Sequence, residues 1–289
     1  MPRGYNIVDE AILQNRLWLP NVLRPALWLD ASDISTITIA TGVSEWRDKS
    51  GNQRNVTQAT GATQPTQTLG GLNGKSVLSF NGSQYLTSPA AVSTWNFLHN
   101  TNGSTVIAVW KAGNVSDPNA VYSLIGNNAG VSGNIGFYII YDDRVSSSRN
   151  DRVLIQISRG ISGQSAVQNI TADGAYPANT PTIISQVADP NNGTAANRSF
   201  LRINRTLIQN NTDLFAPVAT NASFALQIGA CGNNIIPLVG YIAEVIILSS
   251  IASNSTRQIL EGYLAWKWGL QNNLSQDHPF LNRPPLIGD

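Results

Sequence analysis

Residues 240–269, GYIAEVIILSSIASNSTRQILEGYLAWKWG, decide the fold of this chain. The opening run up to the paired serines is short, apolar and rich in β-branched side chains, which predicts a strand. Ser255 and Gln258 then have the spacing of a capping box, and Gly269 stands where a left-handed helix C-cap is expected. Between these caps, apolar side chains recur at helical spacing over a wide arc. Lys267 falls inside that arc, and we interpret it as snorkelling near the helix end. The stretch therefore predicts a strand, a turn and an apolar helix that must pack against the rest of the chain.

Almost everything before this helix is typical of short strands separated by polar turns. The predicted strands are Ala26–Leu29, Val43–Arg47, Ser76–Phe80, Tyr85–Leu86, Thr105–Trp110, Ile135–Tyr141, Arg152–Ser158, Thr182–Val187, Ser199–Ile203 and Phe224–Ile228. Gly70–Gly74 reads as a turn, and Asn81-Gly82 between apolar runs predicts a hairpin. Residues Asp9–Trp18 fit either a short helix or an extended arm. Many strands without intervening helices favour an antiparallel sandwich or barrel.

Composition narrows the functional classes. Charged residues make up 12% of the 289 residues, about half the usual share, and the net charge of +1 gives no support to nucleic-acid binding. The single cysteine, Cys231, excludes an intrachain disulfide, and its apolar neighbours suggest a buried side chain. The N-terminus has no apolar signal region, and no apolar run is long enough to cross a bilayer. We therefore expect a protein made in a cytoplasm and not inserted into a membrane.

Several stretches together carry a family resemblance. They are residues 26–33 (ALWLDASD), 43–52 (VSEWRDKSGN), 72–82 (LNGKSVLSFNG), 242–248 (IAEVIIL) and 261–270 (EGYLAWKWGL), closing on 278–280 (HPF). As a set they resemble the laminin-G-like jelly-roll domains of the concanavalin A-like lectin/glucanase superfamily, of the kind found in bacterial and bacteriophage surface proteins. The resemblance implies an all-β fold, a two-sheet antiparallel jelly-roll sandwich with one C-terminal α-helix packed on it. It also implies a non-catalytic binding or structural module, often directed at carbohydrate.

The resemblance divides the chain into an N-terminal arm (1–23), a jelly-roll domain (24–280) and a C-terminal tail (281–289). Within it, hydrolysis of a glycoside would need two carboxylates across a cleft. Glu244 is alone on its predicted strand between the apolar Ile242 and Ile246, so we interpret it as a carboxylate at a sheet margin or paired with an arginine. A serine triad needs an imidazole, and His278 before Pro279 is better explained by a structural hydrogen bond. We therefore predict that the protein is not an enzyme and needs no cofactor.

Two kinds of binding residue remain as candidates. Trp46 and Trp95 border loops and could stack on a glycan. Asp142, Asp143 and Asp151 belong to a polar loop that could offer oxygen ligands to calcium.

The terminal arm offers apolar side chains for a different role. Its candidate partner-binding residues are Ile12, Leu13, Leu17 and Trp18. Our first hypothesis is a bacteriophage virion structural protein, a surface decoration or tail-associated protein, that contacts other virion proteins or copies of itself through its terminal segments. The alternative is a glycan-binding adhesin or receptor-binding tip that contacts a cell-surface glycan, and a glycoside-active enzyme ranks third.

Overall fold

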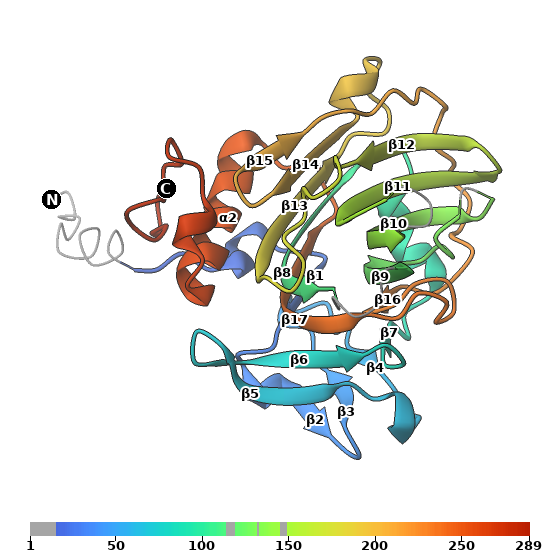
Figure 1. The fold of residues 1–289 in the computed structure, drawn as a ribbon. Coiled ribbons are helices and arrows are strands. Elements are labelled where there is room, and N and C mark those ends of the chain that lie inside the picture. The colour runs from blue at the N-terminus through green and yellow to red at the C-terminus, as the bar shows by residue number, and fades with distance from the viewer. Residues whose placement is uncertain (1–15, 114–118, 132, 145–148) are drawn as a thin grey trace, which may run out of the picture.

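A computed structural model describes residues 16–113, 119–131, 133–144 and 149–289, and the structural statements below concern these residues. Two antiparallel sheets pack face to face and enclose an apolar core (Figure 1). The predicted all-β sandwich is therefore confirmed. No helix in the described part is long and apolar enough to cross a membrane.

The first sheet lies between the helix and the second sheet. Its strands, in spatial order, are β15 Thr206–Ile208, β14 Ser199–Ile203, β13 Thr182–Ala188, β8 Ser104–Ala112, β17 Val239–Leu248, β6 Lys75–Asn81 and β5 Thr66–Leu72. One edge of β17 pairs with β8, and the other edge pairs first with β6 and then with β1 (Leu27–Asp30). Strand β17 therefore pairs with three strands of this sheet.

The second sheet closes the opposite side of the core. Its order is β12 Gln164–Ile170, β11 Arg152–Ile161, β10 Ile135–Arg144, β9 Asn119–Gly126, β16 Gln227–Ile228, β7 Leu86–Thr87, β4 Val56–Thr57, β3 Val43–Trp46 and β2 Ile37–Ile39. Short 3₁₀ helices punctuate the loops: η1 Pro20–Leu23, η2 Ile34–Thr36, η3 Gly61–Thr63, η4 Val92–Leu98, η6 Ala195–Asn197 and η7 Gln271–Asn273.

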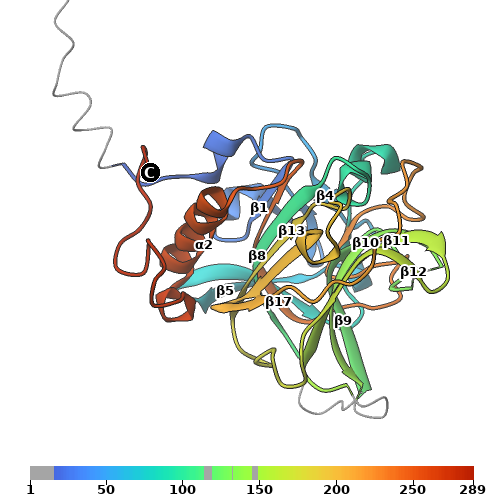
Figure 2. The same cartoon turned by 90° about the horizontal axis from the view of Figure 1, so that it is seen from above.

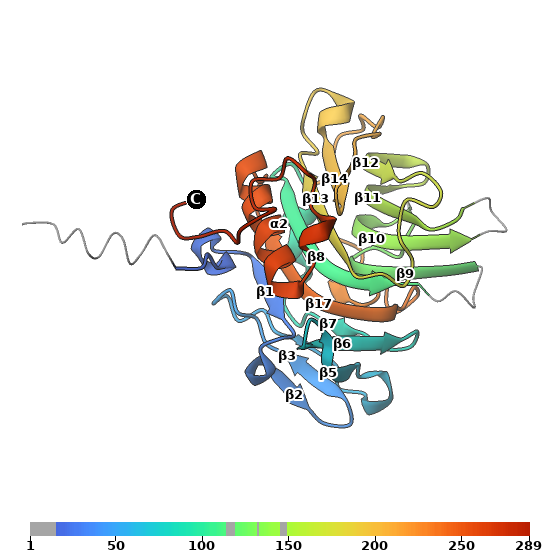
Figure 3. The same cartoon turned by 60° about the vertical axis from the view of Figure 1, so that its left-hand side comes forward.

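Helix α2 (Asn254–Trp268) forms a third layer. It lies on the face of the first sheet that points away from the second sheet, as Figures 2 and 3 show from two directions. Its buried side chains Leu260, Leu264 and Trp268 pack against Ile107 and Ile246 of the sheet. Because both faces of β8 and β17 are covered, these strands read as continuous apolar runs without the polar alternation of a half-exposed sheet.

The structure confirms the predicted cap at the C-terminus of α2 but not the one at its N-terminus. Gly269 has φ 71° and ends the helix as a left-handed C-cap, as predicted. The predicted capping box of Ser255 and Gln258 is wrong, because the helix starts earlier. Ser253 is the N-cap, and its Oγ accepts the backbone N–H of Thr256 at 3.1 Å.

The predicted Asn81-Gly82 hairpin is also wrong. Strand β6 ends at Asn81 in the first sheet, whereas the next strand, β7, belongs to the second sheet. The hairpin is instead Asn73-Gly74, which joins β5 to β6 with φ values of 48° and 71°, the left-handed pair that a tight antiparallel turn requires. The residues before Asn73 that read as part of a turn continue β5 up to Leu72.

Residues 16–18 pair with residues 285–287 beside the helix. Leu17 pairs with Leu286 in an antiparallel bridge, the N–H of Trp18 donates to the carbonyl of Pro285 at 3.0 Å, and Ile287 donates to Arg16 at 2.8 Å. Residues 16–18 are thus extended, and the rest of the predicted helix or arm at Asp9–Trp18 lies outside the described residues. This pairing brings both terminal segments against the helix.

Candidate functional site

A β-bulge in β17 determines where its only carboxylate points. The register of β17 against β8 shifts between Ile242 and Glu244, so one extra residue is inserted there. Ile242 faces the core between the sheets, while Ala243 faces the helix. The bulge lets Glu244 face the helix as well, whereas simple alternation from Ile242 would turn it into the apolar core.

Strand β1 brings a second acid to the same face. Leu27 and Leu29 point into the core, so the alternating residues Trp28 and Asp30 point toward the helix. Asp30 is the register partner of Glu244 across the β1–β17 pair. Two acids from distant parts of the sequence therefore stand side by side, 3% and 0% exposed respectively.

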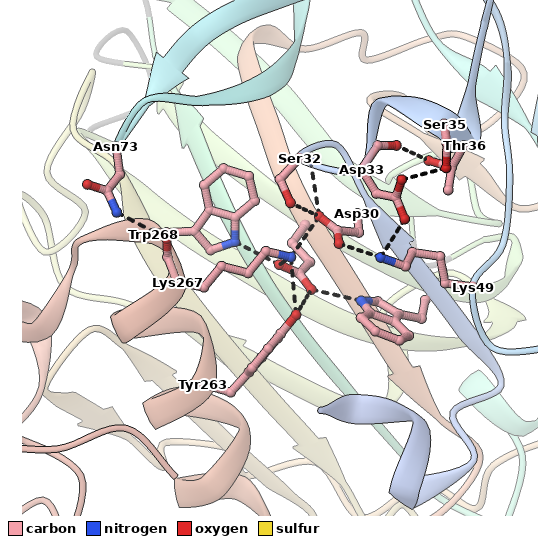
Figure 4. Close-up of polar contacts among 12 residues, drawn as sticks. Asp30, Ser32, Asp33, Ser35, Thr36, Lys49, Asn73, Tyr263, Lys267 and Trp268 are labelled. Atoms are coloured by element: carbon pink, nitrogen blue, oxygen red, sulfur yellow. Dashed lines mark hydrogen bonds and ion pairs between the residues drawn. The ribbon is translucent and has the colours of Figure 1, made fainter. Parts of the chain in front are cut away.

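The helix supplies the groups that neutralise them. Tyr263 and Lys267 are one turn apart on α2, and the ammonium of Lys267 lies 2.7 Å from Asp30 Oδ1 and 2.7 Å from Glu244 Oε2 (Figure 4). Lys267 also donates to the Tyr263 hydroxyl at 3.1 Å. The two Glu244 oxygens accept further bonds from Tyr263 O–H at 2.9 Å and from the indole N–H groups of Trp28 and Trp268, both at 2.7 Å.

Lys49 joins the cluster from the loop that follows β3. The Asp48 carboxylate accepts the backbone N–H of Trp28, and the Lys49 N–H donates to the Trp28 carbonyl, so this loop is fastened to β1. The Lys49 ammonium then lies 2.8 Å from Asp30 and 2.9 Å from Asp33. Figure 4 shows Asp30 held between Lys49 and Lys267.

Burial and ion pairing shift the pKa values of Asp30 and Glu244 in opposite directions. Burial raises the pKa of Asp30, but the charge and hydrogen bond of Lys267, aided by Lys49, outweigh it and set the pKa below its ordinary value. For Glu244, complete removal from water is the larger effect and raises the pKa, while Lys267 opposes the rise. Burial and the adjacent Glu244 carboxylate also raise the pKa of Tyr263.

A cavity of about 520 Å³ opens above this cluster. Aromatic rings, lysines and the two terminal segments form its wall: Leu17, Trp18, Leu19, Trp28, Asp30, Lys49, Asn73, Lys75, Tyr263, Trp266, Lys267, Pro284 and Pro285. Glu244 is absent from this wall because it is sealed beneath Lys267 and the two indoles. A cavity of this size, with aromatic walls and a few convergent polar groups, is typical of a small-molecule site.

The structure places the predicted glycan-binding tryptophans elsewhere. Trp46 and Trp95 are both 0% exposed and belong to the core between the sheets, so the prediction that they stack on a sugar is wrong. Each lies beside a loop in the sequence, but the side chain points inward. The tryptophan that is half-exposed toward the cavity is Trp266, whose indole N–H donates to the Phe280 carbonyl at 2.8 Å.

The predicted calcium ligands are occupied by other partners. Arg144 and Arg149 bind both oxygens of Asp142 at 2.7–2.8 Å. Asp151 accepts the Tyr141 hydroxyl, and its own N–H donates to Asp143. Among the residues that the structure describes, no group of three or more His, Cys, Asp or Glu could hold a metal ion.

The arm residues divide into described and undescribed positions. Ile12 and Leu13 lie outside the described residues. Trp18 is 5% exposed and packs edge-on against Tyr263 with ring centroids 5.9 Å apart, so this side chain is buried by its own chain and is not free for a partner. Leu17, by contrast, is 62% exposed.

Two interpretations of charged residues also need correction. Glu244 is neither at a sheet margin nor paired with an arginine, and Lys267 forms buried ion pairs instead of snorkelling. A lysine inside the apolar arc of a helix was the available signal that a buried acid lies opposite. The structural role of His278 is confirmed, since its Nδ1 accepts the N–H of Phe280 at 3.2 Å. Cys231 is buried, as expected, and burial raises the pKa of its thiol to about 12.

Comparison with known proteins supports the fold. No family model and no curated protein matches the sequence. Among solved structures, the binding domain of botulinum neurotoxin serotype D is similar, with TM-score 0.53 and 13% identity over 82% of this chain and 50% of that chain. Trypanosoma rangeli sialidase in complex with sialic acid has TM-score 0.54 and 12% identity over 90% of this chain and 37% of its own.

A further similar structure is the binding domain of botulinum neurotoxin DC in complex with SialylT, with TM-score 0.52 and 12% identity over 83% of this chain and 52% of that one. The chain thus spans about half or less of the length of these proteins. At such low identity the similarity establishes the β-sandwich fold, consistent with the lectin-like jelly roll that the sequence predicted.

Proposed function

We propose that this protein is a non-catalytic glycan-binding module that holds its sugar in the cavity between α2, β1 and the two terminal segments. The observation that carries the proposal is the wall of that cavity, where Trp266 offers an aromatic surface next to Asn73 and three lysines. Sugars present apolar C–H faces and hydroxyl groups, so they need an aromatic surface and convergent polar groups together.

The structural comparisons support this reading over a role in particle architecture. The similar structures are toxin binding domains and a sialidase, and two of those named above are complexes with sialic acid or SialylT. The ligands in these complexes are ligands of those proteins. For this chain, the similarity to them favours the glycan-binding alternative, and the comparisons give no support to a virion role.

The same site argues for binding without cleavage. Glycosidases place two carboxyl groups on either side of the glycosidic bond, about 5–10 Å apart and both open to the sugar. Here Asp30 lines the cavity, but Glu244 is fully buried and the Lys267 ammonium lies between them. A carboxylate that has no access to the sugar cannot act as acid, base or nucleophile on it.

The test is a glycan array followed by calorimetric titration of the hits. Trp266→Ala should weaken binding at least about fivefold, because truncating an aromatic contact in a desolvated site costs about 1 kcal/mol or more. Trp266→Phe keeps a ring and should retain most of the affinity. Phe215→Ala is the matched control, because Phe215 is an exposed aromatic outside the cavity wall.

Two results would refute the proposal. One is an array without hits at high protein concentration. The other is binding that Trp266→Ala leaves unchanged. Release of shorter sugars from a bound glycan, lost in Asp30→Asn, would instead show an enzyme.

A second candidate function, attachment to a virion through the N-terminal segment, rests on a separate observation. Leu17, Leu19 and Val22 expose 62%, 46% and 53% of their surface in the described part of that segment. Deleting residues 1–15 together with Val22→Asp removes Ile12, Leu13 and the exposed apolar Val22 but keeps Leu17 in the cavity wall and Trp18 against Tyr263. If the segment attaches the protein, this variant should lose incorporation into purified particles while glycan binding is retained. Normal incorporation would exclude this role.

A further inference from the structure

The cavity wall carries more positively charged side chains than negatively charged ones. Three lysines line the cavity, Lys49, Lys75 and Lys267, whereas Asp30 is the one acid in its wall. Each ammonium carries three N–H donors and no acceptor. The number of donors that the protein itself uses therefore decides what an occupant must supply.

Lys267 has no donor left for an occupant. Its ammonium bonds to Asp30 at 2.7 Å, to Glu244 at 2.7 Å and to the Tyr263 hydroxyl at 3.1 Å, which uses all three N–H groups. Tyr263 in turn spends its own proton on Glu244. Lys267 and Tyr263 therefore have no hydrogen-bond donor left for a ligand.

Lys49 and Lys75 are different. Lys49 bonds to Asp30 and Asp33 and lies over the Trp28 ring at 4.6 Å, which leaves one N–H without a hydrogen-bond acceptor among the described residues. The ammonium of Lys75, on β6 next to the Asn73-Gly74 turn, forms no hydrogen bond or ion pair with any described residue, although the side chain is half-buried in the wall. The wall therefore presents several unused, positively charged donors.

The acceptors in the wall are largely taken. Asp30 Oδ1 receives Lys267 together with the N–H and O–H groups of Ser32, and Asp30 Oδ2 receives Lys49. The indole N–H groups of Trp28 and Trp266 are also spent, on Glu244 and on the Phe280 carbonyl. What the side chains of the wall lack is an acceptor-rich, negatively charged partner for Lys75 and Lys49.

We propose that the ligand of this cavity is an acidic sugar, whose carboxylate binds Lys75 and the free donor of Lys49 while its ring lies against Trp266. This rests on the proposed glycan-binding function and names the class of glycan. A carboxylate offers acceptor oxygens and one negative charge, which match these lysines, and the aromatic surface accommodates an uncharged ring face.

The experiment compares two pairs of oligosaccharides that differ in acid groups. Lactose is paired with 3′-sialyllactose, and trigalacturonate with its methyl ester. The protein is titrated calorimetrically with each oligosaccharide at low and at raised salt. The variants are Lys75→Gln, which removes the charge, Lys75→Arg, which keeps it, and Lys111→Gln as control. Lys111 lies over the Tyr241 ring and outside the cavity wall.

We expect the wild type to bind at least one acidic member about tenfold more tightly than its neutral counterpart, the worth of one charge-assisted hydrogen bond. Lys75→Gln should erase that preference without weakening the neutral sugar. Lys75→Arg and Lys111→Gln should keep it, and raised salt should reduce it.

The failures are distinguishable. Equal affinity for acidic and neutral members, unchanged in Lys75→Gln but lost in Trp266→Ala, would overturn the acidic ligand and leave glycan binding intact. A preference for the acid that Lys75→Gln does not alter would overturn the role of Lys75. If neither these sugars nor any glycan on the array binds, the proposed function falls, and this inference falls with it.

Discussion

The two faces of the first sheet are buried to a similar depth by different chemistry. The face toward the second sheet is packed with apolar side chains such as Ile242, Val245 and Trp110. The face toward α2 combines apolar packing with a buried cluster of Asp30, Glu244 and Lys267. Apolar packing tolerates substitutions of similar volume, whereas buried charges depend on each partner being present. The cavity opens over the charged face. The face whose buried charges each need a partner is therefore the one that positions the site.

A second charge pair extends this contrast along the helix. Arg257 and Glu261 are both 3% exposed, 2.5 Å apart, and lie on α2 beside His278. Burial raises the pKa of Glu261, but the His278 imidazole, 3.4 Å from the carboxylate, and the charge of Arg257 lower it below its ordinary value. Buried charged groups therefore lie along α2 at Arg257 and Glu261 as well as at Lys267.

The largest effect that would test this contrast is expected for Lys267→Met. It leaves Glu244 and Asp30 buried without their shared cation, and we expect a loss of about 3–5 kcal/mol in the free energy of unfolding. Denaturant unfolding measures it, with Lys111→Met, on the same sheet but outside the cluster, as control. If Lys267→Met cost no more than the control, the ion pairs would not hold the helix.

The next effect compares one tryptophan from each face. Trp268 and Trp110 are both 0% exposed, but the Trp268 indole donates to Glu244, whereas the Trp110 indole N–H has no hydrogen-bond partner among the described residues. Replacement by Phe removes a similar volume at both sites. Trp268→Phe should therefore cost about 1–3 kcal/mol more than Trp110→Phe, the worth of a hydrogen bond to a charged group. Equal losses in urea unfolding would mean that the charged face is held by packing alone.

The pH dependence of stability follows from Asp30. Its pKa is lower in the folded protein than in the unfolded chain, so its ion pairs stabilise the fold above the ordinary pKa of 3.8. This contribution is lost as the pH falls through the folded pKa. Glu244 acts with the opposite sign, because its raised pKa makes the folded state bind a proton more tightly.

Unfolding free energies measured from about pH 2 to pH 7 should therefore fall less steeply on acidification in Asp30→Asn than in the wild type. In Glu244→Gln the fall should be steeper, since the opposing contribution is removed. Identical slopes in all three proteins would contradict the assigned shifts.

Much of the fold could be predicted from the sequence because apolar patterns report burial directly. The long strands β8, β10, β11 and β17 all lie within or around predicted runs, as does α2. Strands such as β5, TQTLGGL, and β12, QSAVQNI, were missed because they lie at the edges of their sheets. An edge strand pairs through its backbone and needs few apolar side chains.

The site was less predictable for three physical reasons. The bulge at Ala243, which turns Glu244 toward the helix, leaves no mark in an apolar run. The partnership of Asp30 with Glu244 depends on a pairing between residues far apart in the sequence. Trp46 was expected to stack on a glycan but lies in the core, because position next to a loop does not tell which way a side chain points.

The smallest expected effect concerns the helix start. Ser253→Ala should cost about 1 kcal/mol of stability, because the Thr256 N–H loses its side-chain acceptor. Ser255→Ala should cost only a few tenths of that. If thermal unfolding showed a larger loss of stability for Ser255→Ala than for Ser253→Ala, the capping box predicted from Ser255 and Gln258 would be supported instead.

The central claim is that a sugar occupies the cavity over the charged face, and the indole N–H region of a ¹⁵N-labelled NMR spectrum tests it most directly. The chain has seven tryptophans, of which Trp18, Trp28 and Trp266 line the cavity. Addition of the oligosaccharide that binds most tightly in the titrations should shift the Trp266 resonance most, and those of Trp28 or Trp18 next. The signals of Trp46 and Trp95 should stay in place. Shifts confined to tryptophans outside the cavity, or no shift at saturating sugar, would contradict the account.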